Sequence, residues 1–289
     1  MIPTFFKKDC TVNFEVLIKL IDKLAEWGYD KVVINGSTSE VVKLSVDERI
    51  NIAEYVVENC KSKITIISGT GTPCAYSTIS LIRTYRDLSI NYILLTPPYY
   101  VKPSFESLEK FYDEVISKVD VNVILYNIPT LVGYELPISL IEKLINNYGQ
   151  VIGVKDSSGN FRYFLELLHR LNGRVSILQG IDELLIPSLI MGCSGAIIAS
   201  PNYLKDVPLR IYRLIESKNY DKVVELHREL MNLWLLIRGK WPSIEKKLTC
   251  EALGVCSECE REPIPKVSEE ELDSILNVSR RIENLLNLS

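Results

Sequence analysis

The sequence predicts an α/β protein: a (β/α)8 TIM barrel of parallel strands with a C-terminal extension of about three helices. Short β-branched and apolar runs alternate with segments in which apolar residues recur at i, i+3 and i+4. Eight such pairs in succession are typical of a closed parallel barrel. The runs are apolar on both faces, as expected for strands that are buried between a packed interior and a layer of helices.

The first helical segment shows the periodicity clearly, because Phe14, Leu17, Ile18, Ile21 and Leu24 fall on one face of a helix. Each later helical segment follows a short strand, as in a series of βα units. The expected strands are residues 2–5, 31–35, 64–68, 92–96, 121–126, 151–155, 175–179 and 196–199.

Only helical patterns follow the eighth strand. We expect a barrel over residues 1–217 and a C-terminal helical extension, packed on the barrel, over residues 218–289. A linker is expected over residues 254–266, where Pro263 and Pro265 interrupt helical order. The expected helices of the extension are residues 220–238, 243–253 and 268–286.

The 289 residues carry a net charge of −4, with 33 basic and 37 acidic side chains and no basic cluster. This balance gives no electrostatic footprint for a nucleic acid or a membrane surface, so the expected partner is a small molecule. Residues 184–204 are uncharged, but Pro187, Gly192 and Pro201 interrupt them, which favours a buried helix and strand over a membrane span. Because the charged residues 7–9 follow only a few apolar ones, we expect no signal peptide and a cytoplasmic protein.

The cysteine pattern favours free thiols, because an odd number of seven without a secretory signal argues against a disulfide framework. Cys250, Cys256 and Cys259 are more closely spaced than the rest. Three interpretations of this group stay open: reduced thiols, a local disulfide, or a zinc site whose fourth ligand is missing nearby. The only histidines, His169 and His227, do not lie at strand ends, so the sequence offers no ligand cluster for a metal-dependent aldolase.

Lys155 closes the apolar run at residues 151–154, just before the turn-forming residues 156–159, and so lies at the carboxyl end of an expected strand. Barrel enzymes keep their reactive residues at this end of the strands. Most lysines are solvated surface charges. At a barrel mouth, however, desolvation penalises the ammonium and frees an amine that can attack a carbonyl, which makes Lys155 the candidate Schiff-base nucleophile.

Other polar residues follow the strands at the same end of the expected barrel. Ser37 and Thr38 offer hydroxyls and backbone N–H groups that suit a carboxylate, although an ordinary helix cap would use the same residue types. Tyr126 offers a phenol that can transfer protons once it is hydrogen-bonded to a hydroxyl such as that of Ser37. Among fifteen tyrosines, the alternative for any one of them is packing.

With these residues in view, the chain resembles the dihydrodipicolinate synthase and N-acetylneuraminate lyase superfamily, which includes the archaeal 2-keto-3-deoxygluconate aldolases. Residues 36–40, Gly-Ser-Thr-Ser-Glu, are similar to the family pattern G-[ST]-T-G-E. Residues 126–129, Tyr-Asn-Ile-Pro, are similar to its Y-N-x-P. Residues 153–159, Gly-Val-Lys-Asp-Ser-Ser-Gly, are similar to its Schiff-base lysine segment. The three motifs occur in order on the expected strands and span nearly the whole chain.

The resemblance implies that Lys155 forms the Schiff base, that Tyr126 shuttles protons, and that Ser37 and Thr38 bind the carboxylate of pyruvate or another 2-oxo acid. Tyr100 resembles a tyrosine that family members lend across a dimer interface. The resemblance also implies a homo-oligomer, a tetramer built as a dimer of dimers, with no metal or organic cofactor. The predicted substrate-binding residues are Ser37, Thr38, Gly180, Asp182, Glu183 and Ala199.

Departures from the family pattern bear on the substrate. Leu131 stands where the synthases have an arginine for the semialdehyde carboxylate, Val132 replaces a Ser or Thr, and Ser39 replaces a glycine. Residues 180–183, Gly-Ile-Asp-Glu, resemble the G-Y-D-E of the neuraminate lyases, whose acids hold sugar hydroxyls. Residues 201–204, Pro-Asn-Tyr-Leu, look instead like the ketodeoxygluconate aldolases. Asp182 and Glu183 are equally consistent with first-turn acids that complement a helix dipole.

The expected function is therefore a pyruvate-dependent class I lyase or aldolase that cleaves or forms a carbon–carbon bond in a 2-keto-3-deoxy sugar acid. The alternatives are 4-hydroxy-tetrahydrodipicolinate synthase or a ketodeoxy-acid dehydratase, both of which share the imine. A catalytically inactive barrel scaffold is the non-enzyme alternative, against which the presence of Lys155, Tyr126 and Ser37 argues.

Overall fold

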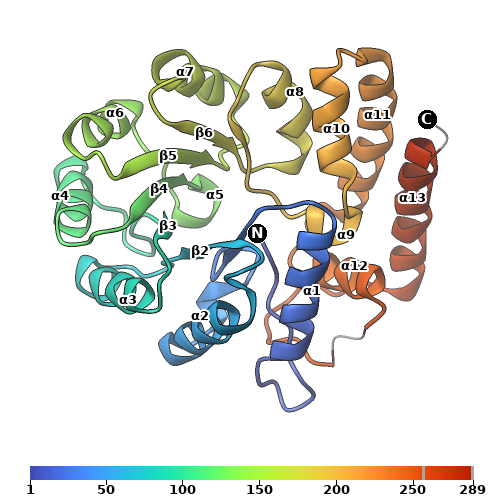
Figure 1. The fold of residues 1–289 in the computed structure, drawn as a ribbon, viewed down its shortest axis with the longest axis horizontal. Coiled ribbons are helices and arrows are strands. Elements are labelled where there is room, and N and C mark those ends of the chain that lie inside the picture. Colours follow the sequence, from blue (N-terminus) through green and yellow to red (C-terminus); the bar gives the residue numbers. More distant parts are fainter. Residues whose placement is uncertain (256–257, 288–289) are drawn as a thin grey trace.

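The computed structural model describes residues 1–255 and 258–287, and its described part contains one parallel sheet of seven strands in the order of the chain. Each strand pairs with the next one along the sequence, and the sheet curls around a central axis (Figure 1). The α/β class and the parallel sheet are therefore confirmed. The strands are β1 (Lys31–Ile34), β2 (Thr65–Gly69), β3 (Tyr92–Leu95), β4 (Asn122–Asn127), β5 (Val151–Asp156), β6 (Ser176–Gln179) and β7 (Gly195–Ala196).

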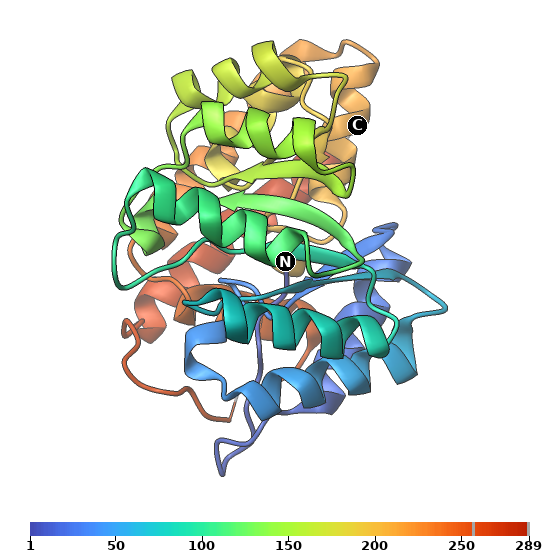
Figure 2. The same cartoon turned by 90° about the vertical axis from the view of Figure 1, so that its left-hand side faces the viewer.

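Helices surround the sheet, and Figure 2 shows those that follow β2 to β5 stacked side by side on its outer face. The helices before α11 are α1 (Phe14–Glu26), α2 (Val46–Cys60), α3 (Ala75–Asp87), α4 (Phe105–Ile116), α5 (Pro129–Val132), α6 (Ile138–Asn147), α7 (Phe161–Leu171), α8 (Leu185–Ile190), α9 (Pro201–Leu204) and α10 (Val207–Glu216), with 3-10 turns η1 (Val41–Lys43) and η2 (Asp182–Leu184).

Both faces of the strands are buried, but in different cores. In β4, Val123 and Leu125 point outward into the large core shared with the helices, whereas Ile124 and Tyr126 point inward into a smaller core inside the curled sheet. This alternation follows from the two-residue period of a strand. It explains why the strands are apolar throughout, and it directs Tyr126 toward the interior.

The first expected strand is the exception. Residues 2–5 form no regular strand, so an exact eight-stranded barrel is not what the structure shows. The segment still lies beside β1, because the backbone N–H of Ile2 donates to Val33 O at 3.1 Å. On its other side, the Asn202 amide donates to Met1 O at 2.8 Å. The N-terminal segment thus fills the gap between β1 and the chain after β7 through individual hydrogen bonds rather than through a ladder.

The three expected C-terminal helices are confirmed as α11 (Tyr220–Ile237), α12 (Ser243–Leu253) and α13 (Glu269–Asn287). They lie together on one side of the sheet (Figure 1). A second apolar core joins them to the helices that follow β7, since Leu230 and Ile282 share it with Leu204 of α9 and Ile211 of α10. This core crosses residue 217, and the division into units at that residue stays a prediction. None of the helices in the described part of the chain combines the length and the apolar character that crossing a membrane requires.

The expectation of free thiols is wrong for two cysteines, because Cys10 and Cys259 form a disulfide between positions 249 residues apart in sequence. Cys259 is therefore not available as a zinc ligand, and its disulfide is not local; Cys256 lies outside the described residues. Spacing could not reveal the pair, because only the fold brings the N-terminal loop against the C-terminal one.

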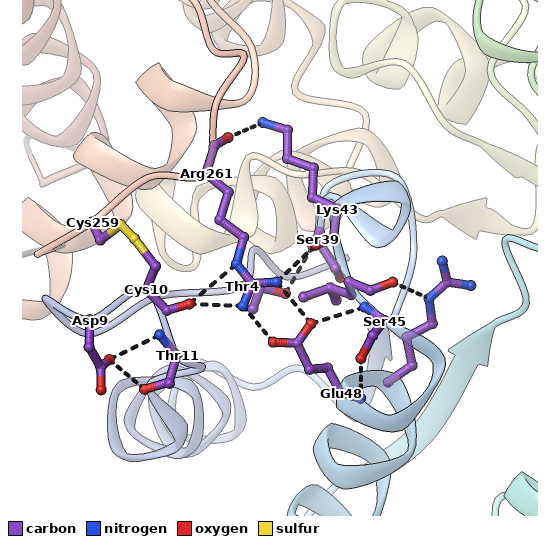
Figure 3. Close-up of polar contacts among 12 residues, drawn as sticks. Thr4, Asp9, Cys10, Thr11, Ser39, Lys43, Ser45, Glu48, Cys259 and Arg261 are labelled. Atoms are coloured by element: carbon purple, nitrogen blue, oxygen red, sulfur yellow. Dashed lines mark hydrogen bonds and ion pairs between the residues drawn. A yellow bond between two sulfur atoms is a disulfide. The ribbon is translucent and has the colours of Figure 1, made fainter.

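Arg261, close to the disulfide, ties the expected linker to the N-terminal part of the chain (Figure 3). Its guanidinium donates to Cys10 O at 2.8 Å and forms an ion pair with Glu48 at 2.5 Å. It also donates to Lys43 O at 2.8 Å. Glu48 belongs to a capping box with Ser45 that begins α2, so one cation connects the linker, the N-terminal loop and a helix start.

We predict that replacing Cys10 and Cys259 by Ser lowers the free energy of unfolding by about 2–5 kcal/mol, because the cross-link restricts the unfolded chain over a very long loop. Denaturant unfolding of the oxidised protein and the double variant measures the difference. Cys74→Ser, at an exposed thiol outside the disulfide, is the matched control and should change the value by less than about 0.5 kcal/mol. Equal midpoints for the double variant and the oxidised protein would show that the cross-link does not stabilise it.

Candidate active site

A cavity of about 290 Å³ lies at the carboxyl ends of the strands. The expected site residues gather here because parallel strands carry their C-terminal ends to the same edge of a sheet. Ser37, Thr38, Tyr126, Lys155, Gly180, Asp182, Glu183 and Ala199 all line it, together with Ile128, Thr130, Leu131, Ser157, Ile181, Ile197, Ile198, Trp241 and Glu245.

Lys155 and Tyr126 are direct neighbours across the β4–β5 ladder. The Lys155 amine donates to the Tyr126 hydroxyl at 3.1 Å and lies 4.3 Å from the centre of its ring. The lysine is only 2% exposed. A buried amine whose hydrogen-bond partner is a phenol rather than a carboxylate has the surroundings that a nucleophilic lysine needs.

The Tyr126 hydroxyl also contacts the Ser37 hydroxyl at 3.1 Å, and either group can donate. Ser37, Tyr126 and Lys155 therefore form a continuous hydrogen-bonded row from the end of β1 to β5. Such a row can move a proton between a bound molecule and the hydroxyl groups of Tyr126 and Ser37. Thr38 stands next to it, and its backbone N–H contacts the Met1 sulfur at 3.3 Å.

The loop that holds Ser37 and Thr38 is fixed by its own polar residues. The Ser39 hydroxyl donates to Ile2 O at 2.7 Å and accepts from Gly36 N at 3.2 Å. Thr4 donates to Ser39 O at 2.9 Å (Figure 3). Left-handed backbone occurs at Glu40, with φ 53°, and not at Ser39. Serine in place of the family glycine is thus compatible with the loop and adds a hydrogen bond to it.

A buried charge network continues behind this loop. Glu40 forms ion pairs with Lys246 of α12 and with Lys43, the latter at 2.6 Å. Lys43 also donates to Arg261 O at 2.8 Å (Figure 3). Because removing one partner of a buried ion pair leaves an uncompensated charge, these contacts hold the loop, α12 and the linker in one arrangement.

Asn127 and Asp156, each one residue after a cavity residue, point away from the cavity and join their strands. The Asn127 amide donates to Asp156 Oδ1 at 2.7 Å, and Leu136 N donates to Asn127 Oδ1 at 3.0 Å. Burial raises the pKa of Asp156 to about 6, against hydrogen bonds from Asn127 and Ser158 that lower it. These bonds fix the backbone next to Tyr126 and Lys155, so they position the two side chains without contacting a ligand.

Gly180 is required by close approach rather than by its backbone angles. A Cβ at this position would lie 2.7 Å from the Cε atom of Lys155 and would also overlap the Ser157 hydroxyl. Any larger residue would therefore push the lysine from its place, since carbon atoms do not approach so closely. Gly180 makes room for the amine.

The two predicted acids after β6 have different surroundings. Asp182 accepts hydrogen bonds from Ala199 N at 3.3 Å and Ser200 N at 3.1 Å, so both of its oxygens serve the backbone. Burial raises the pKa of Asp182 above its usual range. Glu183 lies 3.7 Å from Arg238 of the C-terminal extension in a largely exposed ion pair. Asp182 therefore holds the backbone at residues 199 and 200 in place. Ala199 takes part in this contact through its backbone N–H and not through its side chain.

Tyr100 is the one predicted catalytic residue that the structure does not bring to the cavity. Its side chain is 98% exposed, and its backbone is left-handed with φ 75°. Leu131 lies at the cavity with 54% of its surface exposed, while Val132 is buried in the inner core. Leu131 therefore presents a hydrocarbon side chain to the cavity.

Sequence reasoning missed Trp241 and Glu245, which reach the cavity from α12 and the turn before it. Only a weak feature of the sequence pointed to this helix as part of the site. Most residues of α12 are buried, and yet its first turn contains the charged residues Glu245 and Lys246. Within residues 1–255 and 258–287, no group of three or more His, Cys, Asp or Glu side chains is arranged to hold a metal ion.

Comparison with known proteins agrees with this geometry. The model of the dihydrodipicolinate synthetase family matches residues 1–281. An uncharacterized DapA-like lyase of Pyrobaculum aerophilum is 42% identical over 283 residues, which cover 94% of each chain.

Two solved structures share the fold. Dihydrodipicolinate synthase from Aquifex aeolicus superposes with a TM-score of 0.90 at 26% identity and covers 98% of this chain and 96% of its own. CdNal from Clostridium difficile, solved in complex with mannosamine, has a TM-score of 0.88 at 24% identity, with 97% of both chains covered. At that identity, the second similarity concerns the fold alone.

Proposed function

The chain belongs to the dihydrodipicolinate synthetase family and is a lyase of the class I aldolase type; within this class, we propose that it cleaves or forms a carbon–carbon bond in a 2-keto-3-deoxy sugar acid. The observation that carries the proposal is the buried Lys155 amine, 3.1 Å from the Tyr126 hydroxyl, which in turn contacts Ser37.

The proposed reaction begins when the Lys155 amine attacks the C2 ketone of the substrate, and loss of water from the resulting carbinolamine gives an iminium ion. The iminium accepts the electron pair of the C3–C4 bond as that bond breaks, while the C4 hydroxyl loses its proton and becomes an aldehyde. Protonation of the enamine at C3 and hydrolysis then release pyruvate and restore the amine. Tyr126 is the proposed proton carrier, with Ser37 as its partner, and Ser37 and Thr38 are the proposed carboxylate ligands.

The substrate proposal rests on other residues that line the cavity. Leu131 offers no cation for a semialdehyde carboxylate, and an unpaired buried charge is costly. Glu183 and Glu245 instead offer oxygen atoms that can bind hydroxyls, whereas the oxygens of Asp182 accept backbone N–H groups. These residues favour a sugar aldehyde as the second product over aspartate semialdehyde as a substrate. The synthase and the ketodeoxy-acid dehydratase are the alternatives, because they would use the same imine.

We also propose a homo-oligomer, a dimer of dimers, in which Tyr100 is lent to a second copy of the chain. The almost complete exposure of this aromatic side chain, on left-handed backbone beside the exposed Val101, supports the proposal. A small-molecule partner rather than a nucleic acid or a membrane, a reaction without a cofactor and a cytoplasmic location stay predictions.

Incubation with pyruvate and borohydride should add a reduced pyruvyl group to Lys155, because reduction traps the imine that this buried amine forms with a ketone. Mass mapping of peptides locates the adduct. Lys155→Met, which keeps the length of the side chain but lacks the amine, is the matched control and should stay unlabelled. An adduct on a different lysine, or none on folded protein, would refute the mechanism.

Tyr126→Phe should reduce kcat about 100-fold or more while borohydride trapping at Lys155 persists, because a positioned acid–base group typically contributes that much and the amine is unchanged. Turnover and trapping are measured side by side. Tyr92→Phe, at the amino end of β3, removes a phenol on the same inner core and should leave kcat unaltered. Full turnover in Tyr126→Phe would reduce Tyr126 to a packing residue.

Glyceraldehyde should condense with pyruvate with a higher kcat/KM than aspartate semialdehyde, because Leu131 leaves the semialdehyde carboxylate unpaired. Steady-state rates with both aldehydes give the ratio. Leu131→Arg tests the cause and should shift the ratio toward the semialdehyde. A preference of the unmodified protein for the semialdehyde, roughly tenfold or more, would restore the synthase alternative.

A further inference from the structure

Glu245 is an acid of the cavity that neither the family motifs nor the strand ends account for. It comes from the first turn of α12, in the C-terminal extension, and lines the same cavity as Lys155 and Tyr126. Its Oε2 atom is buried and has no hydrogen-bond partner among the residues that the structure describes. A buried polar atom without a partner is costly, so an atom of this kind in a cavity is expected to be satisfied by water or by a ligand.

The other two acids of the cavity are already engaged. Asp182 accepts two backbone N–H groups, from Ala199 and Ser200, and Glu183 pairs with Arg238. Glu245 is therefore the acid with a buried oxygen to spare. Its backbone carbonyl accepts from the Thr249 hydroxyl at 2.6 Å, a bond within the helix that does not involve the side-chain carboxyl.

The chemistry of the carboxyl favours a neutral ligand group. Burial, followed by the nearby charge of Asp182, raises the pKa of Glu245 to about 8, against the positive charges of the N-terminal amine and Lys155, which lower it. A protonated carboxyl presents one O–H donor and an acceptor oxygen. That pair matches a hydroxyl group, which also donates and accepts, and it does not attract a second anion.

We propose that Glu245 is a specificity-determining residue that hydrogen-bonds a hydroxyl of the aldehyde half of the substrate, so that the C-terminal extension selects hydroxylated aldehydes. The inference rests on the proposed function, and it assigns the recognition of hydroxyls to Glu245 rather than to Asp182. In this proposal Lys155 carries out the chemistry, and Glu245, which lines the same cavity, distinguishes substrates.

The test compares glyceraldehyde with acetaldehyde, which has the same reactive group and no hydroxyl, as partners for pyruvate. In Glu245→Ala, the ratio of kcat/KM for glyceraldehyde to that for acetaldehyde should fall by at least tenfold, the usual effect of losing a hydrogen bond in a buried site. In Glu245→Gln, whose amide can donate and accept, the ratio should stay within about threefold of the unmodified protein. Glu251→Gln, on the exposed face of α12, is the matched control and should not move the ratio.

Borohydride trapping with pyruvate distinguishes a failure of the proposed function from a failure of the assignment of Glu245. If Lys155 of the unmodified protein is not labelled, the proposed function fails. If it is labelled and Glu245→Ala leaves the ratio unchanged, or if Ala and Gln lower it equally, only the assignment of Glu245 is overturned. Preference of the unmodified protein for acetaldehyde, or failure to condense any hydroxylated aldehyde despite labelling, would overturn the assignment as well.

Discussion

The site depends on one constraint, the register of β4 against β5. Parallel pairing sets Tyr126 opposite Lys155 and Asn127 opposite Asp156. Because side chains alternate along a strand, the first pair meets inside the curled sheet and the second pair meets behind it. A shift of either strand by one residue would turn the side chains of that strand to the other face and remove either the amine or the phenol from the cavity. The Asn127–Asp156 hydrogen bond therefore helps to keep the Lys155 amine beside the Tyr126 hydroxyl, although it contacts neither group.

The sequence predicted those site residues that can be recognised from their immediate neighbours along the chain. Lys155 and Tyr126 each end a short apolar run and Ser37 closely follows one, and parallel strands bring such ends together. Gly180 was predicted as a binding residue, yet the structure gives it a steric reason to be glycine, the passage of the Lys155 side chain. The roles of these residues stay predictions, whereas their gathering around one cavity is observed.

The rest was hidden because it depends on contacts between distant segments. Glu245 reaches the cavity only because α12 packs beside the sheet, and nothing in the local periodicity of residues 243–253 sets that placement. Cys10 and Cys259 pair across nearly the whole chain, which spacing rules cannot detect. Residues 2–5 have the composition of a strand, but the N-terminal segment makes only separate hydrogen bonds to its neighbours. Composition does not distinguish such a segment from a strand that forms a regular ladder.

The Cys10–Cys259 disulfide also changes the topology of the molecule as a covalent object. Residues 10–259 form a closed ring that contains every strand of the sheet and the cavity. A protease that cuts one exposed loop within this ring leaves a single covalently connected molecule, because the two pieces remain joined through sulfur. The ring therefore tolerates one backbone break without releasing a fragment, and only a second cut or reduction can separate the parts that build the site.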